Sequence, residues 1–317
     1  MTTVTRSESR SRRSSPVPGS APRRRRAFPW FKYLSVLPLL LFFVGLIAYP
    51  VIQLVWMAFG DVRLVAGDLL WRFVGLENFE RMLGDATFAR SLSNSAVFIF
   101  FSVVLTLVLG IALALATDKV VRTQQWVQNV LIWPAIIAPV VISVIWLLIL
   151  SPQIGLLNKL LASIGLTPQT WLGEPVGAMA SIILVDVWHW TPIVFLFVYT
   201  ALRGLDASVL EAAQMDGASY ASTVRHIILP LLTPAIIGVT AIRIVMGVKA
   251  FDEMYLLTFG GPGDATTVIT IYLRSIFFEA FQYGYGAALS VTVVVLVIIV
   301  ILFAFGFQAV LRRLSRG

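Results

Sequence analysis

Long apolar runs, separated by polar segments, follow one another along the chain from residue 34 onward. A helix of about 20 apolar residues crosses a hydrocarbon core of about 30 Å, and six runs are this long. None alternates between apolar and polar residues as a strand does, and backbone amides inside a bilayer must find partners within their own segment. We therefore expect an all-α, polytopic membrane protein with six transmembrane helices. The predicted spans are Leu34–Phe59, Asn94–Thr117, Val130–Leu150, Ala178–Ala201, Leu229–Val248 and Ala287–Val310.

The composition agrees with a chain whose solvent is the bilayer. Of the 317 residues, 58% are hydrophobic and 13% are charged, and the mean hydropathy is +0.89. These values lie outside the range of soluble globular proteins. The sequence contains no cysteine, which excludes a disulfide framework, a thiolate metal site and a cysteine nucleophile.

The net charge of +8 comes mainly from the N-terminal tail, residues 1–32, which is rich in Arg, Ser and Pro. Its few apolar side chains cannot offset the entropy of ordering, so we expect a disordered cytoplasmic tail. Residues 33–317 are then expected to form a single transmembrane domain. Because the charge is confined to a tail, it gives no reason to expect nucleic acid as a partner. The first apolar run is too long for a secretory signal peptide and is expected to remain as the first span.

The Lys and Arg residues that flank the spans predict the orientation of the chain. The basic tail places the N-terminus in the cytoplasm, and six spans return the C-terminus to the same side, where Arg312, Arg313 and Arg316 lie. The segments Asp118–Gln128 and Arg203–Ile228 are then cytoplasmic. We expect a multi-pass protein of the cell (inner) membrane with both termini in the cytoplasm.

Several prolines interrupt the predicted spans, and each removes one helical hydrogen bond and favours a kink. Kinked helices suit a moving transport pathway, but such prolines also serve ordinary packing when neighbouring groups satisfy the freed carbonyl. Either interpretation fits these positions. The prolines are Pro50, Pro134, Pro139, Pro192 and Pro234.

The cytoplasmic segment between the fourth and fifth spans, about residues 203–228, is too long and too patterned for a plain turn. Ser208 followed three residues later by Glu211 is typical of a capping box, which predicts a short helix that starts at Ser208. Gly217 is expected to end this helix. A second helix is predicted from about Ser219 toward Pro230, which gives a helix, a glycine turn and a helix.

Three elements of this segment carry a resemblance to a known family: Glu211-Ala212-Ala213, Asp216-Gly217-Ala218 and Ile228-Leu229-Pro230. Together they resemble the EAA motif of permease subunits in binding-protein-dependent ABC importers. The resemblance implies that the segment forms a coupling helix, which docks into a cleft on a separate ATPase subunit. It assigns the coupling role to Glu211, Ala212, Ala213, Asp216, Gly217 and Pro230.

An amphipathic helix pair that lies on the lipid surface is the alternative interpretation of this segment. The pair carries three acidic residues, Asp206, Glu211 and Asp216, against two basic ones, Arg203 and Arg225. This balance disfavours anionic lipid as its partner.

A second resemblance concerns the class of substrate. The stretch from Phe251-Asp252-Glu253 to the run Gly260-Gly261-Pro262-Gly263, with the later Tyr283–Ala287, is similar to sugar-importing permeases related to those for maltose and glycerol phosphate. The resemblance implies a sugar, polyol or related glycoside as substrate and covers nearly all of the chain from Leu34 onward. The glycine run itself permits tight turns and close backbone approach at the outer mouth.

Ionisable and aromatic residues within the spans are candidates for the substrate pathway. Aromatic faces and planar polar groups bind sugars. Adjacent helical residues do not share a face, and helix packing or a contact between subunits is the favoured role for Asp186 and His189. Either Arg243 or Lys249 could pair with a carboxylate of a partner permease, and the sequence does not choose between them. The candidate pathway residues are Asp186, Trp188, Trp190, Phe251, Asp252 and Tyr255.

Other functions leave parts of the sequence unexplained. The two histidines, His189 and His226, show no metal spacing and no catalytic arrangement, so we expect neither an enzyme nor a cofactor. A channel or an ATP-independent secondary transporter is the main alternative, but the cytoplasmic motif would then have no role. The chain has no glycine loop ending in Gly-Lys-Ser or Gly-Lys-Thr. The expected partners are therefore a cytoplasmic ABC ATPase dimer, a second permease subunit, an extracytoplasmic substrate-binding protein and membrane lipid.

Overall fold

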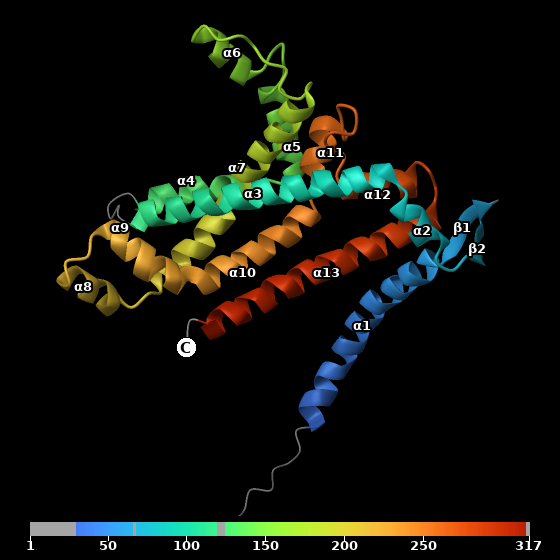
Figure 1. Ribbon diagram of the computed structural model, residues 1–317, viewed down its shortest axis with the longest axis horizontal. Coiled ribbons are helices and arrows are strands. Elements are labelled where there is room, and N and C mark those ends of the chain that lie inside the picture. The colour runs from blue at the N-terminus through green and yellow to red at the C-terminus, as the bar shows by residue number, and fades with distance from the viewer. Residues whose placement is uncertain (1–29, 66–67, 119–123, 315–317) are drawn as a thin grey trace, which may run out of the picture. The chain divides into compact units, whose positions relative to one another are not determined.

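The computed structural model describes residues 30–65, 68–118 and 124–314, and its helices follow the apolar runs of the sequence (Figure 1). The chain divides into two compact units, residues 1–50 and 51–317, which are described separately. Residues 1–29 of the predicted tail and 119–123 of the predicted cytoplasmic segment lie outside the described residues. The first unit contains most of α1 (Trp30–Ala58), and the described side chains of this helix are apolar and largely exposed.

The second unit opens with a β-hairpin that the sequence did not predict. Strand β1 (Gly60–Val65) pairs with β2 (Asp68–Phe73) in antiparallel register, with Val62 opposite Trp71. The ring of Trp71 stacks on that of Trp56 at a centroid distance of 4.7 Å, and its indole nitrogen donates to the Trp56 carbonyl at 3.2 Å. This exposed aromatic contact fixes the hairpin to the end of α1.

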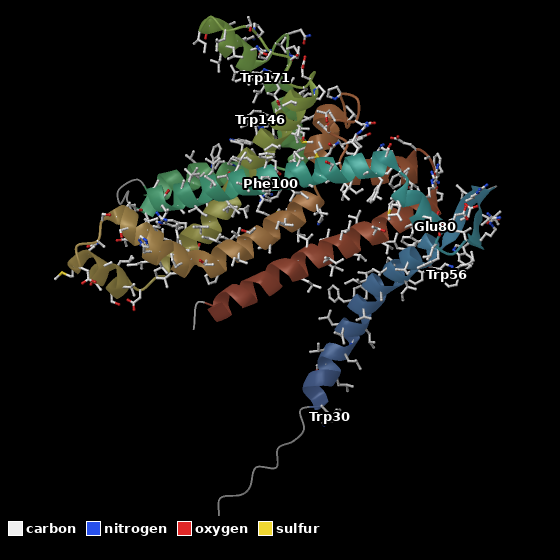
Figure 2. All side chains as sticks on the ribbon, in the orientation of Figure 1. Trp30, Trp56, Glu80, Phe100, Trp146 and Trp171 are labelled. Atoms are coloured by element: carbon white, nitrogen blue, oxygen red, sulfur yellow. The ribbon has the colours of Figure 1, made fainter. Side chains whose placement is uncertain are left out.

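Helix α7 (Pro175–Arg203) forms the centre of the second unit, since 67% of the residues in its most apolar 18-residue stretch are buried. It packs along α3 (Ala86–Asp118), which follows the short helix α2 (Glu77–Leu83). The two long helices approach closely at Gly110, where an added Cβ would lie 2.6 Å from a methyl carbon of Val194. Small residues allow this kind of close approach between membrane helices. Phe100, also on α3, does not take part in this contact and is exposed (Figure 2).

The predicted third span is broken. Its two parts, Asn129–Ile136 at the end of α4 (Gln124–Ile136) and α5 (Pro139–Ile149), are bent by 101°. Ala138, at the break, is extended with φ −63° and ψ 139°, because a following proline disfavours the helical conformation of the residue before it. Pro139 therefore ends one helix and begins another, whereas Pro50, Pro192 and Pro234 lie inside continuous helices.

The remaining elements complete the second unit. After α5 come α6 (Leu156–Ser163) and α7, then α8 (Ala207–Met215), α9 (Tyr220–Thr223) and the π-helical segment η1 (Val224–Ile228). They continue into α10 (Leu229–Val248), α11 (Asp252–Thr258), α12 (Ile269–Phe278) and α13 (Tyr283–Leu314).

The helical fold class is confirmed. Among the described residues, five helices are long and apolar enough to cross a membrane, or six if the bent pair α4–α5 forms one span. Several helices begin earlier than predicted: α3 starts at Ala86 rather than Asn94, and α7 at Pro175 rather than Ala178. The added turns are amphipathic or polar, so hydropathy alone does not detect them.

Candidate functional site

The cytoplasmic segment contains the predicted short helix, but its N-terminal cap differs from the prediction. Helix α8 begins at Ala207, and its cap is Asp206, whose carboxylate accepts a hydrogen bond from the Ser208 amide at 3.0 Å. The predicted capping box of Ser208 and Glu211 is therefore wrong, because the N-cap is Asp206. Aspartate caps helices as well as serine does. Asp206 lies two residues before Ser208 and caps the helix there. The hydrogen bond from the Ser208 amide lowers the pKa of the exposed Asp206 carboxyl.

Helix α8 ends as predicted, at a turn that needs glycine. The Gly217 amide donates to the Gln214 carbonyl, and the Ala218 amide donates to the Ala213 carbonyl, both at 3.0 Å. This pair of bonds is the Schellman motif, with Gly217 in the left-handed conformation at φ +71°. The turn sends the chain back toward α9, which Ser219 caps through a bond from the Ser222 amide at 3.3 Å.

The second arm does not stop at a loop but continues into the fifth predicted span. From Tyr220 to Val248 the backbone stays helical, and residues 224–228 widen into a π-helical turn. Pro230 follows at the first turn of α10. Because proline has no amide hydrogen, it interrupts the regular ladder at this point. The predicted helix toward Pro230 is thus continuous with a membrane helix.

Two contacts tie this segment to the ends of the long helices. Arg203, the last residue of α7, forms an ion pair with Asp118 of α3 at 3.6 Å. The Tyr220 hydroxyl donates to the Leu115 carbonyl of α3 at 3.4 Å. The motif residues of α8 differ in exposure: Ala213 is buried, whereas Glu211 and Ala212 are exposed.

A second candidate site lies in the middle of α7, where two pairs of ionisable side chains are buried. Asp186 accepts a hydrogen bond from Arg243 of α10, Nη2 to Oδ2, at 2.5 Å. The Nδ1 atom of His189 lies 3.0 Å from Oε1 of Glu253 on α11. Arg243 therefore has a carboxylate partner within its own chain, whereas Lys249 is exposed at the end of α10. The arrangement matches the favoured packing role of Asp186 and His189.

Trp190 joins this group from the next position of α7. Its ring stacks on His189 at a centroid distance of 4.3 Å, and the Arg243 guanidinium carbon lies 5.7 Å from its centre. Only one nitrogen of Arg243 has a hydrogen-bond acceptor among the described residues, since Nε and Nη1 are buried without a partner. Buried donors without acceptors are costly, so an acceptor from outside the described side chains would lower this cost.

The other predicted pathway residues lie nearby but do not all converge. Phe251 and Tyr255 stack on one face of α11 at a centroid distance of 5.0 Å, and both pack against the same buried cluster as Val187 of α7. Asp252 begins this helix and is half-buried. Trp188 turns away from Asp186 and meets Trp146 of α5, labelled in Figure 2, edge to face at 5.7 Å.

The glycine run forms the tight loop that the sequence predicted. Gly260 has φ +89°, and a Cβ at this position would lie 2.5 Å from the Thr267 hydroxyl oxygen. Thr266 and Thr267 donate to the carbonyls of Gly261 and Gly260 at 2.7 and 3.0 Å. The Asn94 amide of α3 donates to the Asp264 carbonyl at 2.9 Å. The loop is therefore fixed to α3.

Comparison with known proteins identifies the family. Residues 106–317 match the family described as the binding-protein-dependent transport system inner membrane component. The chain belongs to this family. The resemblance inferred from the cytoplasmic motif is confirmed, and the chain is a permease subunit of an importer, that is, a transport component.

Similar proteins include sugar permeases. This permease is 33% identical over 253 residues to the trehalose/maltose transport system permease protein MalF of Thermococcus litoralis, which covers 80% of this chain and 84% of that protein. It is 29% identical over 255 residues to the sn-glycerol-3-phosphate permease UgpA of Pectobacterium atrosepticum, covering 80% and 84% of the two chains. A bacterial alginate ABC transporter shares the fold, with a TM-score of 0.79 at 24% identity over 88% of this chain and 95% of that one.

Proposed function

We propose that this permease imports a sugar or a related polyol or glycoside, and that ATP hydrolysis on a separate subunit drives the transport through residues 203–228. The main support is the helix, Schellman turn and helix that carry Glu211, Gly217 and Pro230, because the second helix continues without a break into a membrane helix. The names of the relatives, which include permeases for trehalose/maltose and glycerol phosphate, support the substrate class.

The proposed assembly contains two permeases around one pathway. A second permease subunit pairs with this one, two ATPase subunits dock against α8 from the cytoplasm, and a substrate-binding protein docks outside. Both termini of this chain lie in the cytoplasm, in agreement with its Arg-rich ends. Lipid and the second permease cover the exposed apolar side chains.

In the proposed cycle, coupling passes from α8 through the Gly217 turn into the continuous helix Tyr220–Val248. ATP binding closes the ATPase dimer and draws the two coupling helices together, and α10 turns with them as one body. The pathway then opens outward and accepts a sugar from the binding protein. Hydrolysis returns it to the inward conformation. The ends of α3 and α7 move with the segment because Asp118, Arg203 and Tyr220 join them.

Within the pathway, Trp190 and Arg243 are the proposed sugar contacts. An indole face stacks on the apolar face of a sugar ring, and a guanidinium group donates to its hydroxyl oxygens. Arg243 has two buried donors for this role. Asp186 orients the guanidinium, and the stacked pair Phe251 and Tyr255 lies on the next helix, α11, which Asp252 begins.

Replacement of Gly217 by Val tests the coupling role. A β-branched residue in the left-handed conformation costs about 1–2 kcal/mol, which corresponds to a loss of about 5- to 30-fold in the correctly turned form. An added Cβ here meets no atom within 4 Å, so the effect is on the backbone alone. We expect ATP-dependent sugar uptake by the purified complex in proteoliposomes to fall by this factor, while membrane insertion is unchanged.

Gly217→Asn is the matched control, because asparagine tolerates the left-handed conformation. It is expected to keep most of the uptake and to co-purify with the ATPase, whereas Gly217→Val retains less ATPase in a pull-down of the tagged permease. Equal uptake by the two variants would count against the coupling assignment.

A further inference from the structure

Four ionisable side chains from three helices form a buried cluster in the middle of the second unit. Asp186 and His189 come from α7, Arg243 from α10 and Glu253 from α11, and each is 6% exposed or less. Two direct contacts join them, Asp186 to Arg243 at 2.5 Å and His189 to Glu253 at 3.0 Å. His189 and Glu253 lie 64 residues apart in the chain.

The described elements around this cluster add no other buried charge to it. The described parts of α4 and α5 contain no charged residue. The charged residues of α3 lie at its two ends, where Arg90 pairs with Asp264 and Asp118 pairs with Arg203. Three charged residues flank the cluster itself: Lys249 is exposed, Asp252 is half-buried at the start of α11, and Arg274 of α12 lies over the Tyr255 ring.

The charge count of the cluster depends on one proton. Asp186 and Arg243 cancel each other, which leaves His189 and Glu253. If the imidazole is neutral and the carboxyl is ionised, the cluster carries a net charge of −1. If this pair holds one more proton, on either the imidazole or the carboxylate, the net charge is zero. An uncompensated charge buried within a membrane domain is costly, so the electroneutral form is the stable one.

We propose that the His189–Glu253 pair is a proton-binding site that is occupied at neutral pH, and that the bound proton holds α11 against the middle of α7. The proton comes from water and binds to an imidazole nitrogen or a carboxylate oxygen, and no other bond changes. A metal ion does not fit, because the described residues include no group of three or more His, Asp or Glu side chains arranged to hold one.

The site connects two regions that a transport cycle must move. Helix α7 leads directly into α8 through Gly204–Asp206, and α11 leads into the Gly260–Gly263 loop. Loss of the proton leaves the cluster with a buried negative charge and weakens the contact between the two helices. The inference does not depend on which solute the permease carries.

The chain offers a direct test, because its sequence contains two histidines. In a His226→Gln background, ¹⁵N-histidine labelling of the full-length permease in lipid nanodiscs reports on His189 alone. Infrared spectroscopy of the same samples reports a protonated carboxyl group. At neutral pH we expect one signal or the other: a protonated imidazole, or a carboxyl band that Glu253→Gln removes.

The replacement Glu253→Gln keeps a hydrogen-bond acceptor for Nδ1 but removes the negative charge. If the imidazole carries the proton, this replacement is expected to lower the proton-bound fraction of His189 at neutral pH by about tenfold or more, since an opposite charge at this distance favours the protonated imidazole strongly. If the carboxyl carries it, the replacement removes the carboxyl band and His189 stays neutral. Glu279→Gln, which alters an exposed partner of Arg274, is the matched control and leaves the His189 signal unchanged.

A merely structural hydrogen bond gives a different result. In that case His189 is neutral at neutral pH, no carboxyl band depends on Glu253, and the proposal is overturned. The measurement on the His226→Gln protein already decides this point, so the test stands even where Glu253→Gln does not fold. A His189→Gln/Glu253→Gln double variant is expected to unfold at a temperature that no longer falls as the pH rises above neutrality.

Discussion

Asp85 illustrates how much a single residue contributes to this permease. One of its carboxylate oxygens, Oδ1, accepts the amides of Thr87 and Phe88 at 2.9 and 3.0 Å and so caps α3. The other, Oδ2, accepts the hydroxyls of Tyr272 on α12 and Tyr285 on α13. Arg81 lies over the Tyr285 ring at 4.1 Å. The start of α3 therefore meets the consecutive helices α12 and α13, nearly 200 residues further along the chain, on one side chain.

The titration of Asp85 gives a testable pH dependence. Partial burial raises the pKa of this carboxyl, but the two tyrosine hydroxyls and the two amides together lower it below its ordinary value of 3.8. A lowered pKa in the folded protein stabilises the fold above that ordinary value, and the stabilisation is lost as the pH falls through the folded pKa. Burial and the bond to Asp85 correspondingly raise the pKa of Tyr272 to about 12.

We expect Asp85→Asn to unfold at a lower temperature than the unchanged protein at about pH 6, and the difference to shrink as the pH falls below 3.8 and through the folded pKa of Asp85. Thermal unfolding of the purified permease across this range measures it. Asp264→Asn, which alters an exposed partner of Arg90, serves as the control. A difference that stays constant with pH would contradict the role of the charge.

Helix pairs, rather than single helices, determine the geometry of the second unit. The contact of α3 with α7 passes through Gly110, while the break at Pro139 lets α4 pack on α7 and α5 on α11. Neither arrangement depends on helix propensity. Both depend on how close two backbones can come and on which residue lacks an amide hydrogen.

Two glycine replacements separate packing from helix propensity. Gly110→Ala places a Cβ 2.6 Å from a Val194 methyl carbon and near the Phe195 amide, and overpacking of this kind costs about 1–3 kcal/mol. Gly238→Ala in α10 meets no atom within 4 Å and is expected to be neutral or to stabilise the helix by about 0.5–1 kcal/mol. Unfolding temperatures of the two variants in one detergent test this, and equal shifts would refute the close contact.

The surface of the whole molecule indicates a subunit of a larger assembly. The described part of α1 and much of α13 expose apolar side chains, and lipid or a second permease covers such surfaces in a membrane. The exposed face of α8 carries Met215 and Val209 beside the small residues of the motif. These surfaces agree with the proposed docking of an ATPase and a second permease.

Reconstitution distinguishes an ATP-driven importer from a self-contained transporter. We place the permease alone in vesicles without ATP and with sugar at a higher concentration outside than inside. We expect no uptake above that of empty vesicles. Uptake should appear when the co-purified ATPase, the second permease and the binding protein are added with ATP. Sugar movement by the permease alone would favour the channel or secondary-transporter alternative.

Several features could be predicted from the sequence because they depend on neighbouring residues. The apolar runs predicted the long helices, and the Gly217 turn and the Gly260–Gly263 loop followed from the conformational freedom of glycine. The errors were also local. Asp206 caps α8 in place of Ser208, because two candidates only two residues apart compete and the sequence does not rank them.

The pairing of distant side chains could not be predicted. Asp186 and Arg243 are 57 residues apart, and His189 and Glu253 are 64 residues apart. Their contacts depend on how α7, α10 and α11 turn relative to one another. The same holds for Asp85 and its two tyrosines, and for the hairpin that Trp56 and Trp71 fix.

The sequence by itself determined the membrane environment, the helical class, the helix and glycine turn of residues 207–217, and the family, because hydropathy, glycine turns and short motifs are properties of contiguous residues. Only the tertiary structure decided which charges neutralise one another, which donors of Arg243 stay free and which helix contacts α7. The physical reason is that a buried charge is stabilised by a partner within a few ångströms, and packing between helices, not order along the chain, selects that partner.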